Sequence, residues 1–233
     1  MLLKREKMMK KFNVKTVLCT TVMSLFLTAC GGSDKYDKSV DKLEQNRSSE
    51  LVFVNAMDEM VTFYVKNSIK WKKIFDDNHN ILDQAKYSSS EPIKYTWHND
   101  LNKTDFGVQD TNSKVNKAQV EAELKNGIDF FVVSWESSNE YKISVLEKKP
   151  SNTSDVFRIR VFTDSDMSIK INGSDNVVAT AKKGEVSSAF TINNCSDSLQ
   201  VGNNHIDLCQ GADIGQSYLV VVNSNGKQLI TQE

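Results

Sequence analysis

This chain contains few prolines and few cysteines, and its net charge is close to zero. Its 233 residues include 2 prolines and 4 cysteines, and 29 Lys and Arg residues are balanced by 30 Asp and Glu residues, for a net charge of −1. A neutral chain lacks the basic surface on which nucleic-acid binding depends, so we expect no nucleic-acid partner. No apolar run beyond residue 29 reaches the ~20 residues that a membrane-spanning helix needs.

The common catalytic motifs are absent as well. The histidines, His79, His98 and His205, are scattered, and the sequence holds no HExxH pair, GxSxG elbow, Walker loop or dinucleotide fingerprint. These absences favour a protein that is not an enzyme and that needs no cofactor. A hydrolase with dispersed catalytic residues is the least favoured alternative, since triads assemble in space and leave no fixed spacing in the sequence.

The first 29 residues predict a secretory signal. A basic start is followed by the uncharged segment Val17–Ala29, which is too short to span a bilayer. Met8 or Met9 is an alternative start, because the charge before Lys10 exceeds what a signal needs. We therefore expect an exported protein.

Leu27-Thr28-Ala29-Cys30 resembles the lipobox of bacterial lipoproteins. The resemblance implies cleavage before Cys30, a diacylglycerol on its sulfur and an acyl chain such as palmitate on its new amine, so that membrane lipid is a partner of this residue. Several acyl chains hold a protein firmly, because each buried methylene contributes about 0.8 kcal/mol. Gly31 rather than aspartate follows the cysteine, which favours the outer membrane if the cell has one. The alternative is an ordinary cleaved signal with a chance cysteine.

Residues 30–50 are expected to form the lipidated cysteine and a flexible tether. The stretch GGSDKYDKSVDKLEQNRSSE is polar, alternates in charge and has almost no apolar residues, which is typical of a solvated coil. A coil of this length averages about 25 Å end to end. The folded part is therefore expected to begin at Leu51 and to stay near the membrane.

Removal of the signal and lipidation of Cys30 leave two cysteines, Cys195 and Cys209. An even pair in an oxidising compartment predicts a disulfide, which would close a loop of about 15 residues and stabilise the fold by roughly 3 kcal/mol. A metal site is the alternative, because His205 lies close to Cys209. The pattern lacks a fourth ligand and CxxC spacing, so we favour the disulfide and expect no metal.

Two halves of the chain share one pattern of strands. Gly127–Trp135 matches Gly215–Asn223, since in both a glycine leads, an aromatic residue follows three positions later and an aliphatic run completes the segment. The stretches that begin at Leu51 and at Arg158 each place a strand of alternating residues after an acidic turn. Lys148–Asp155 lies between the halves and is rich in turn-forming residues.

Such repetition predicts an all-β fold of two tandem small antiparallel β-sandwich (Ig-like) units, residues 51–149 and 155–233. The first copy is longer, so we expect an insertion within Trp71–Ser113.

The segment Val115–Gly127 is compatible with two structures. Its Ala, Glu and Leu residues favour a helix capped by Asn116, whereas Val120, Ala122 and Leu124 alternate as in a strand. We favour a strand paired with the segment that follows it, residues 128–135.

VFVNAMDEMVTFYVKN resembles the opening of a repeated β-sandwich domain of unknown function that is found in bacterial exported proteins. Asn55-Ala56, Val61–Val65 and the two glycine-led strands match the motifs of that family, and Met57-Asp58 replaces its Ser-Pro. The resemblance covers a minor part of the mature chain. It implies an exported pair of β-sandwiches and carries over no catalytic residue.

Aromatic residues supply one candidate recognition surface. Tyr95 and Trp97 fall on one face of a strand and lie beside His98 and Asp100. With Trp71 or Trp135 nearby, they could stack on a sugar or on the side chain of a partner. The alternative is that these aromatics, like Trp135, fill the core of the sandwich, and we favour this alternative.

Two oxygen-rich segments supply candidate calcium loops. Asp76, Asn78 and Asn80 have the one-three-five spacing of an EF-hand without its glycine and final glutamate. The second segment contains three aspartates, Asp164, Asp166 and Asp175. We favour ordinary polar turns at both places.

The sequence therefore predicts a lipid-anchored protein of the cell envelope that acts as a non-enzymatic interaction or scaffold module. Its exposed loops or an edge strand would bind an envelope protein or a glycan. The alternative function is a calcium- or carbohydrate-binding module that uses the acidic loop or the Tyr95–Trp97 pair.

Overall fold

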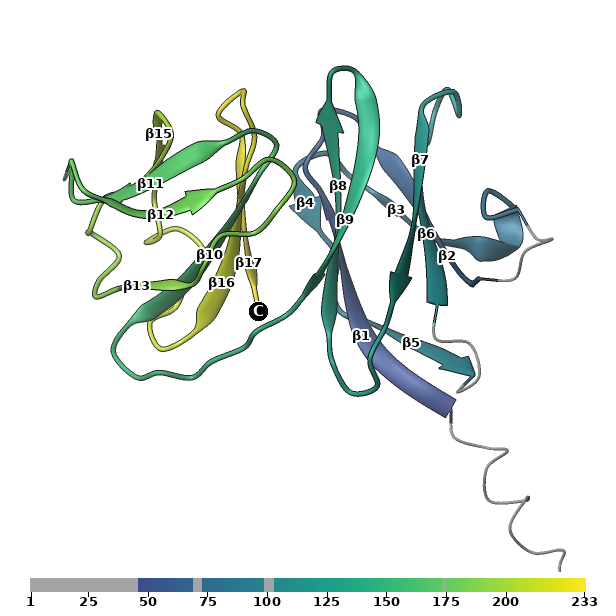
Figure 1. The fold of residues 1–233 in the computed structure, drawn as a ribbon, viewed down its shortest axis with the longest axis horizontal. Helices are drawn as coiled ribbons and strands as arrows, with labels where there is room; N and C mark the ends of the chain where they lie inside the picture. Colours follow the sequence, from purple (N-terminus) through teal and green to yellow (C-terminus); the bar gives the residue numbers. More distant parts are fainter. Residues whose placement is uncertain (1–45, 69–72, 99–102, 174) are drawn as a thin grey trace, which may run out of the picture. The chain divides into compact units, whose positions relative to one another are not determined.

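The computed structural model describes residues 46–68, 73–98, 103–173 and 175–233, all of which belong to the second of two compact units, 41–233. These residues form β-strands joined by turns, with one 3-10 helix, η1 (Asp77–His79) (Figure 1). No helix in the described ranges is long and apolar enough to cross a membrane. The all-β fold class is confirmed.

The first sandwich consists of two sheets that enclose a core around Phe53, Phe63 and Phe106. In strand order, the first sheet contains β4 (Ser88–Ser89), β1 (Asn46–Asn55), β8 (Phe130–Ser137) and β9 (Glu140–Glu147), with β5 (Ile93–His98) also paired to β1. The second sheet contains β3 (Asn80–Gln84), β2 (Val61–Asn67), β6 (Lys103–Asp110) and β7 (Lys117–Glu123).

The second sandwich repeats this arrangement around Ile159, Ile169 and Val220. In strand order, one sheet contains β13 (Phe190–Ile192), β10 (Phe157–Thr163), β16 (Ser217–Val222) and β17 (Gln228–Gln232). The other sheet contains β12 (Val177–Ala181), β11 (Met167–Ile171), β14 (Leu199–Val201) and β15 (Asn204–Ile206).

The equal topology of the two sandwiches confirms that the chain contains two copies of one β unit. One serine in each copy makes the same two contacts. Ser90 donates its backbone N–H to the carbonyl of Phe53 and accepts the N–H of Phe53 on its Oγ, and Ser187 does the same with Val161. The ladders β2–β3 and β11–β12 also carry a register shift at equivalent positions.

The sheets are mainly antiparallel, as predicted, and each copy also contains one parallel strand pair. β1 runs parallel to β8, and β10 runs parallel to β16. Antiparallel neighbours can be joined by a short hairpin, whereas parallel neighbours need a long crossover. Here the crossover is the opposite sheet of the same sandwich, which lies between the two strands in the chain.

The central strands are buried on both faces. Along β1, Leu51 and Phe53 point into the core of the first sandwich, whereas Val52 and Val54 belong to a third apolar cluster that joins the two copies. The other buried members of that cluster are Ala56, Phe131, Val133, Trp135, Phe162, Leu219 and Val221. Strands that are covered on both sides have continuous apolar sequences, which explains the runs LVFV and YLVVV.

Trp135, a member of this third cluster, packs against Phe162 and against Gly184. The Trp135 ring lies edge-on to Phe162, with ring centroids 6.0 Å apart, and its Nε1 donates to Ser144 Oγ at 3.1 Å. Ser144 Oγ donates in turn to the carbonyl of Gly184 at 2.8 Å. A Cβ at Gly184 would lie 2.4 Å from the Trp135 ring, and the φ of 71° at this residue also requires glycine.

The folded part begins at Asn46, ahead of the expected boundary at Leu51. Residues 46–50 are polar, but each pairs with a residue of β5, from Asn46 opposite His98 to Glu50 opposite Lys94. The ladder satisfies their backbone groups, so the strand extends without an apolar face.

The segment Val115–Gly127 contains the favoured strand, β7, but its partner was predicted wrongly. β7 pairs antiparallel with β6 through a hairpin, and not with residues 128–135. The alternating residues Ala118, Val120 and Ala122 face the core of the first sandwich from the sheet opposite β8. Leu124, which is 1% exposed, follows this strand where the chain crosses to the other sheet.

Candidate functional site

β7 is a long, regular edge strand. It lies at the end of the order β3-β2-β6-β7, and within the described residues it pairs with β6 alone. The register is continuous from Lys117 opposite Gln109 to Glu123 opposite Lys103, and the strand contains no proline. Proline, bulges and inward charges are three of the means by which proteins block an edge, and β7 has none of these three, although its exposed face carries Lys117, Glu121 and Glu123.

The backbone of β7 alternates between groups bonded to β6 and groups that point away. The N–H of Asp110 donates to the carbonyl of Asn116 at 3.0 Å, which makes these opposite residues a hydrogen-bonded pair. Bonded and non-bonded pairs alternate along an antiparallel ladder. The bonded positions of β7 are therefore Ala118, Val120 and Ala122. The outward N–H and C=O groups belong to Lys117, Gln119, Glu121 and Glu123.

The two faces of β7 differ in polarity. Ala118, Val120 and Ala122 are half-buried and pack against the core of the first sandwich. The remaining residues of the strand, Lys117, Gln119, Glu121 and Glu123, are exposed.

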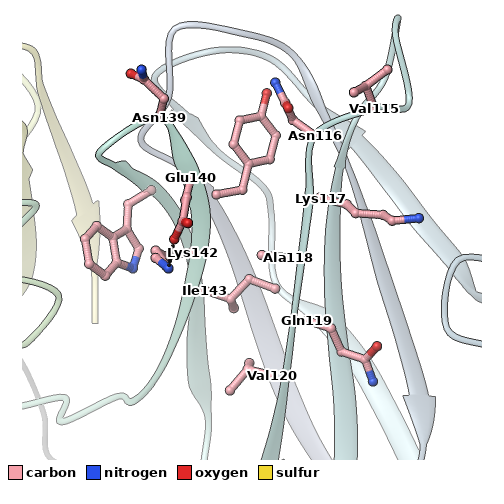
Figure 2. A pocket seen from close by; sticks show the side chains of 12 residues that line it. Val115, Asn116, Lys117, Ala118, Gln119, Val120, Asn139, Glu140, Lys142 and Ile143 are labelled. Carbon is pink, nitrogen blue, oxygen red and sulfur yellow. Dashed lines mark hydrogen bonds and ion pairs between the residues drawn. The ribbon is translucent and has the colours of Figure 1, made fainter.

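A groove of about 580 Å³ lies beside this edge, between β7 and β9 (Figure 2). Its walls are residues 115–120 on one side and 139–143 on the other. Ala118, Val120 and Ile143 point toward one another across the groove, whereas Lys117 and Gln119 point away from it (Figure 2). Val115, which is 75% exposed, stands at one end.

Polar contacts fix the rim of the groove. Tyr141 Oη donates to Glu59 Oε2 at 3.0 Å, and burial together with this acceptor raises the pKa of Tyr141. Lys142 Nζ lies 2.6 Å from Glu140 Oε2, a hydrogen bond that lowers the pKa of Glu140. Outside the groove, on the exposed face of β7, the hydrogen bond to Glu121 raises the pKa of Lys103. The rim therefore carries both signs of charge, and no residue pair on it resembles a nucleophile and its base.

A second, smaller pocket of about 200 Å³ is lined by acidic and amide side chains near Tyr87. Tyr87 Oη donates to Asp58 Oδ1 and accepts Asn223 Nδ2 at 3.1 Å. Burial, with the charges of Glu59 and Asp58, raises the pKa of Glu136 in its wall. The polar groups of this pocket bond mainly to one another, so it is a connection between turns.

The structure corrects the candidate recognition surface at Tyr95, Trp97 and His98. Trp97 is 1% exposed and belongs to the core, because alternate residues of β5 face inward. Tyr95 stacks on it with ring centroids 6.0 Å apart, donates to Asn67 Oδ1 at 3.0 Å, and has a pKa that burial raises to about 12. His98 is exposed. The core alternative is confirmed for Trp97, while Trp71 and Asp100 lie outside the described residues.

The candidate calcium loops serve as turns. Asp164 Oδ2 accepts the N–H and the hydroxyl of Ser224, both at 3.0 Å, and Asp166 Oδ1 accepts the N–H of Lys183 at 2.8 Å. Asp76 caps η1 by accepting the N–H of Asn78 at 3.2 Å. In the part of the chain that the structure describes, no group of three His, Cys, Asp or Glu side chains could hold a metal ion.

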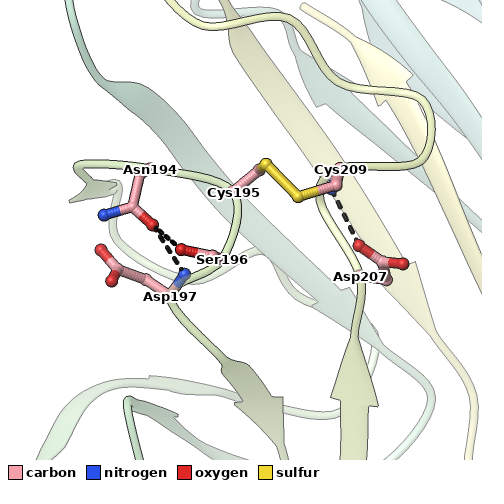
Figure 3. The surroundings of a disulfide bond; sticks show 6 residues. All are labelled: Asn194, Cys195, Ser196, Asp197, Asp207 and Cys209. Atoms are coloured by element: carbon pink, nitrogen blue, oxygen red, sulfur yellow. Dashed lines mark hydrogen bonds between the residues drawn. A yellow bond between two sulfur atoms is a disulfide. The ribbon is translucent and has the colours of Figure 1, made fainter.

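The disulfide between Cys195 and Cys209 is confirmed (Figure 3). Cys195 packs against the core of the second sandwich, and Cys209 donates its backbone N–H to Asp207 Oδ1 at 2.9 Å. The bond uses both sulfurs, so the alternative of a metal site with His205 is wrong. Closing a loop of this length stabilises a fold by roughly 3 kcal/mol.

The fold and the edge define a class of protein: a tandem β-sandwich with an open sheet edge. No protein-family model matches the chain, and no curated protein matches it. Among solved structures, a similar chain is described as "a putative cell adhesion protein from Bacteroides uniformis ATCC 8492". It is 9% identical, with a TM-score of 0.21, over 81% of this chain and 98% of that chain. A TM-score this low carries no argument, so the proposals below depend on the residues of this chain.

The sequence pattern did not identify β7 as the site. The alternation in KAQVEAE predicts a half-buried strand, but an edge strand and a central strand of an antiparallel sheet have the same alternation. Only the strand order shows that this strand lies at an edge.

Proposed function

We propose that this protein is a non-enzymatic interaction module of the bacterial cell envelope. It is held at the membrane by acyl chains on Cys30, and the edge of β7 accepts an extended strand of a protein partner. The observation that carries the proposal is the open edge of β7. Four alternate residues there each direct a backbone N–H and a backbone C=O away from β6. Strand addition to such an edge is a recurrent mode of protein recognition.

A protein strand suits this edge better than a glycan does. The outward groups of β7 repeat at every second residue, which matches the spacing of a second β-strand. The half-buried residues Ala118 and Val120 beside the groove leave room for apolar side chains of an incoming strand. Of the aromatic pair that could have stacked on a sugar, Trp97 is in the core and Tyr95 is half-buried against it. Anchoring at Cys30 is proposed from the lipobox, since this residue lies outside the described residues.

Gln119→Pro tests the edge. The N–H of Gln119 points away from β6, so proline removes no bond of the sandwich, and edge strands tolerate proline at such positions. We expect the thermal midpoint to stay near that of the wild type. Crosslinking in intact cells, followed by affinity purification, should then show loss of the bound partner.

Gln119→Ala is the matched control, because it removes the side chain and keeps the N–H. We expect it to retain the partner. Equal partner recovery with the proline and alanine variants would contradict strand addition at β7.

A further inference from the structure

We infer that the strand accepted by β7 is β7 of a second copy of this chain, paired antiparallel about a two-fold axis at Val120. This inference depends on the proposed function and specifies its partner. It follows from the order of charges along the strand and from the direction of its backbone groups.

The outward backbone groups match one another in this register. A two-fold axis at Val120 places Gln119 opposite Glu121 of the second copy, and Lys117 opposite Glu123 of the second copy. All four of these positions have outward N–H and C=O groups, so each opposite pair can exchange two hydrogen bonds. The symmetric ladder would contain about eight such bonds.

The charges are complementary in the same register. Lys117 of each copy lies opposite Glu123 of the other, which gives two cross-strand ion pairs, and Gln119 can donate to Glu121. Opposite charges that face one another across strands stabilise the pairing, and like charges destabilise it. Lys117 is already held on the outer face, with Nζ 5.1 Å from the centroid of the Phe75 ring.

Neighbouring registers are less favourable. An axis at Glu121 would place two glutamates directly opposite each other. An axis at Gln119 would place Glu123 opposite Val115, which precedes the strand. The register with its two-fold axis at Val120 pairs all seven residues of β7 and places no like charges opposite each other.

The inner face also permits the pairing. Ala118 lies opposite Ala122 of the second copy, and the two Val120 side chains meet beside the groove. The β7 side chains on this face are small or half-buried, and the groove beside them separates β7 from residues 139–143. The two four-stranded sheets would become one continuous sheet of both copies.

Val120→Cys in the full chain, expressed in intact cells, tests the pairing directly. Opposite residues of a non-bonded pair have Cα atoms about 4.5 Å apart, within the range of about 4.4–6.8 Å that a disulfide needs. We expect a species of twice the chain mass on a non-reducing gel and its disappearance on reduction.

Gln119→Cys is the control for random collision. This residue is more exposed than Val120, but in the inferred register its copies are separated by two residues along the strands, too far for a disulfide. Strong crosslinking at Gln119 with none at Val120 would overturn the inference.

Charge exchange gives a second test in the Val120→Cys background. Lys117→Glu and Glu123→Lys each place like charges opposite one another twice, and we expect the disulfide yield to fall about tenfold. Coexpression of the two variants restores both ion pairs and should restore the yield of the mixed dimer. Unchanged yields in the single variants would overturn the register.

The outcomes separate the inference from the proposed function. If Val120→Cys forms no dimer and Gln119→Pro still abolishes the capture of a different protein, the second copy is the wrong partner and strand addition stands. If Gln119→Pro changes neither dimer yield nor capture, strand addition at β7 is wrong.

Discussion

Arg160→Ala is expected to lower the free energy of unfolding by about 3–5 kcal/mol, since it leaves a buried carboxylate without its cation. Arg160 Nε and Nη2 donate to Glu233 Oε1 and Oε2 at 2.6 and 2.7 Å. The side chains of the two residues are 6% and 1% exposed. Arg160 Nη2 also donates to the carbonyl of Glu147 at 2.8 Å, so the guanidinium joins the end of the first sandwich to the second. Urea unfolding followed by fluorescence measures the change.

Lys103→Ala is the matched control for the buried pair. Lys103 and Glu121 form an ion pair of the same length, 2.6 Å, but their side chains are 65% and 45% exposed. Exposed pairs gain little, because water screens the charges. We expect the free energy of unfolding of this variant to stay close to that of the wild type. Equal losses in the two variants would contradict the structural role of Arg160.

Cys30→Ala is expected to abolish the incorporation of labelled palmitate into the protein. In the proposed lipoprotein processing, the acyl chains are attached to Cys30, and each buried methylene contributes about 0.8 kcal/mol to membrane binding. Metabolic labelling followed by immunoprecipitation measures the incorporation. The proposed membrane anchor would be lost together with these chains.

Cys19→Ala is the control, because Cys19 lies before Cys30, within the proposed signal. We expect this variant to incorporate the label as the wild type does. Label on the Cys30→Ala variant, or a free thiol at Cys30 in the mature wild-type protein, would show that the anchor is assigned to the wrong residue.

Much of the fold was predictable, because the two copies repeat short patterns. The glycine-led segments at Gly127 and Gly215 precede β8 and β16, and the cysteine pair predicted the disulfide. The partners of the strands were less predictable. The strand within Val115–Gly127 was expected to pair with residues 128–135, whereas its ladder is formed with β6 across a hairpin.

The parts that sequence patterns missed are set by contacts over long distances. Arg160 and Glu233 are separated by 73 positions, so no local spacing predicts their ion pair. Trp97 lies on a strand of alternating residues, and alternation does not show which face is covered. The edge at β7 depends on the strand order of a complete sheet, to which residues from Val61 to Glu123 contribute.

In the proposed complex, the outward backbone groups of β7 bond to another strand. Amide hydrogen exchange measures this residue by residue in membrane-bound protein and again after dilution in detergent. Gln119 and Glu121 should be protected in the membrane and exchange rapidly after dilution, whereas Ala118 and Val120 should stay protected in both conditions through their bonds to β6. Rapid exchange of Gln119 and Glu121 in the membrane-bound protein would contradict the claim.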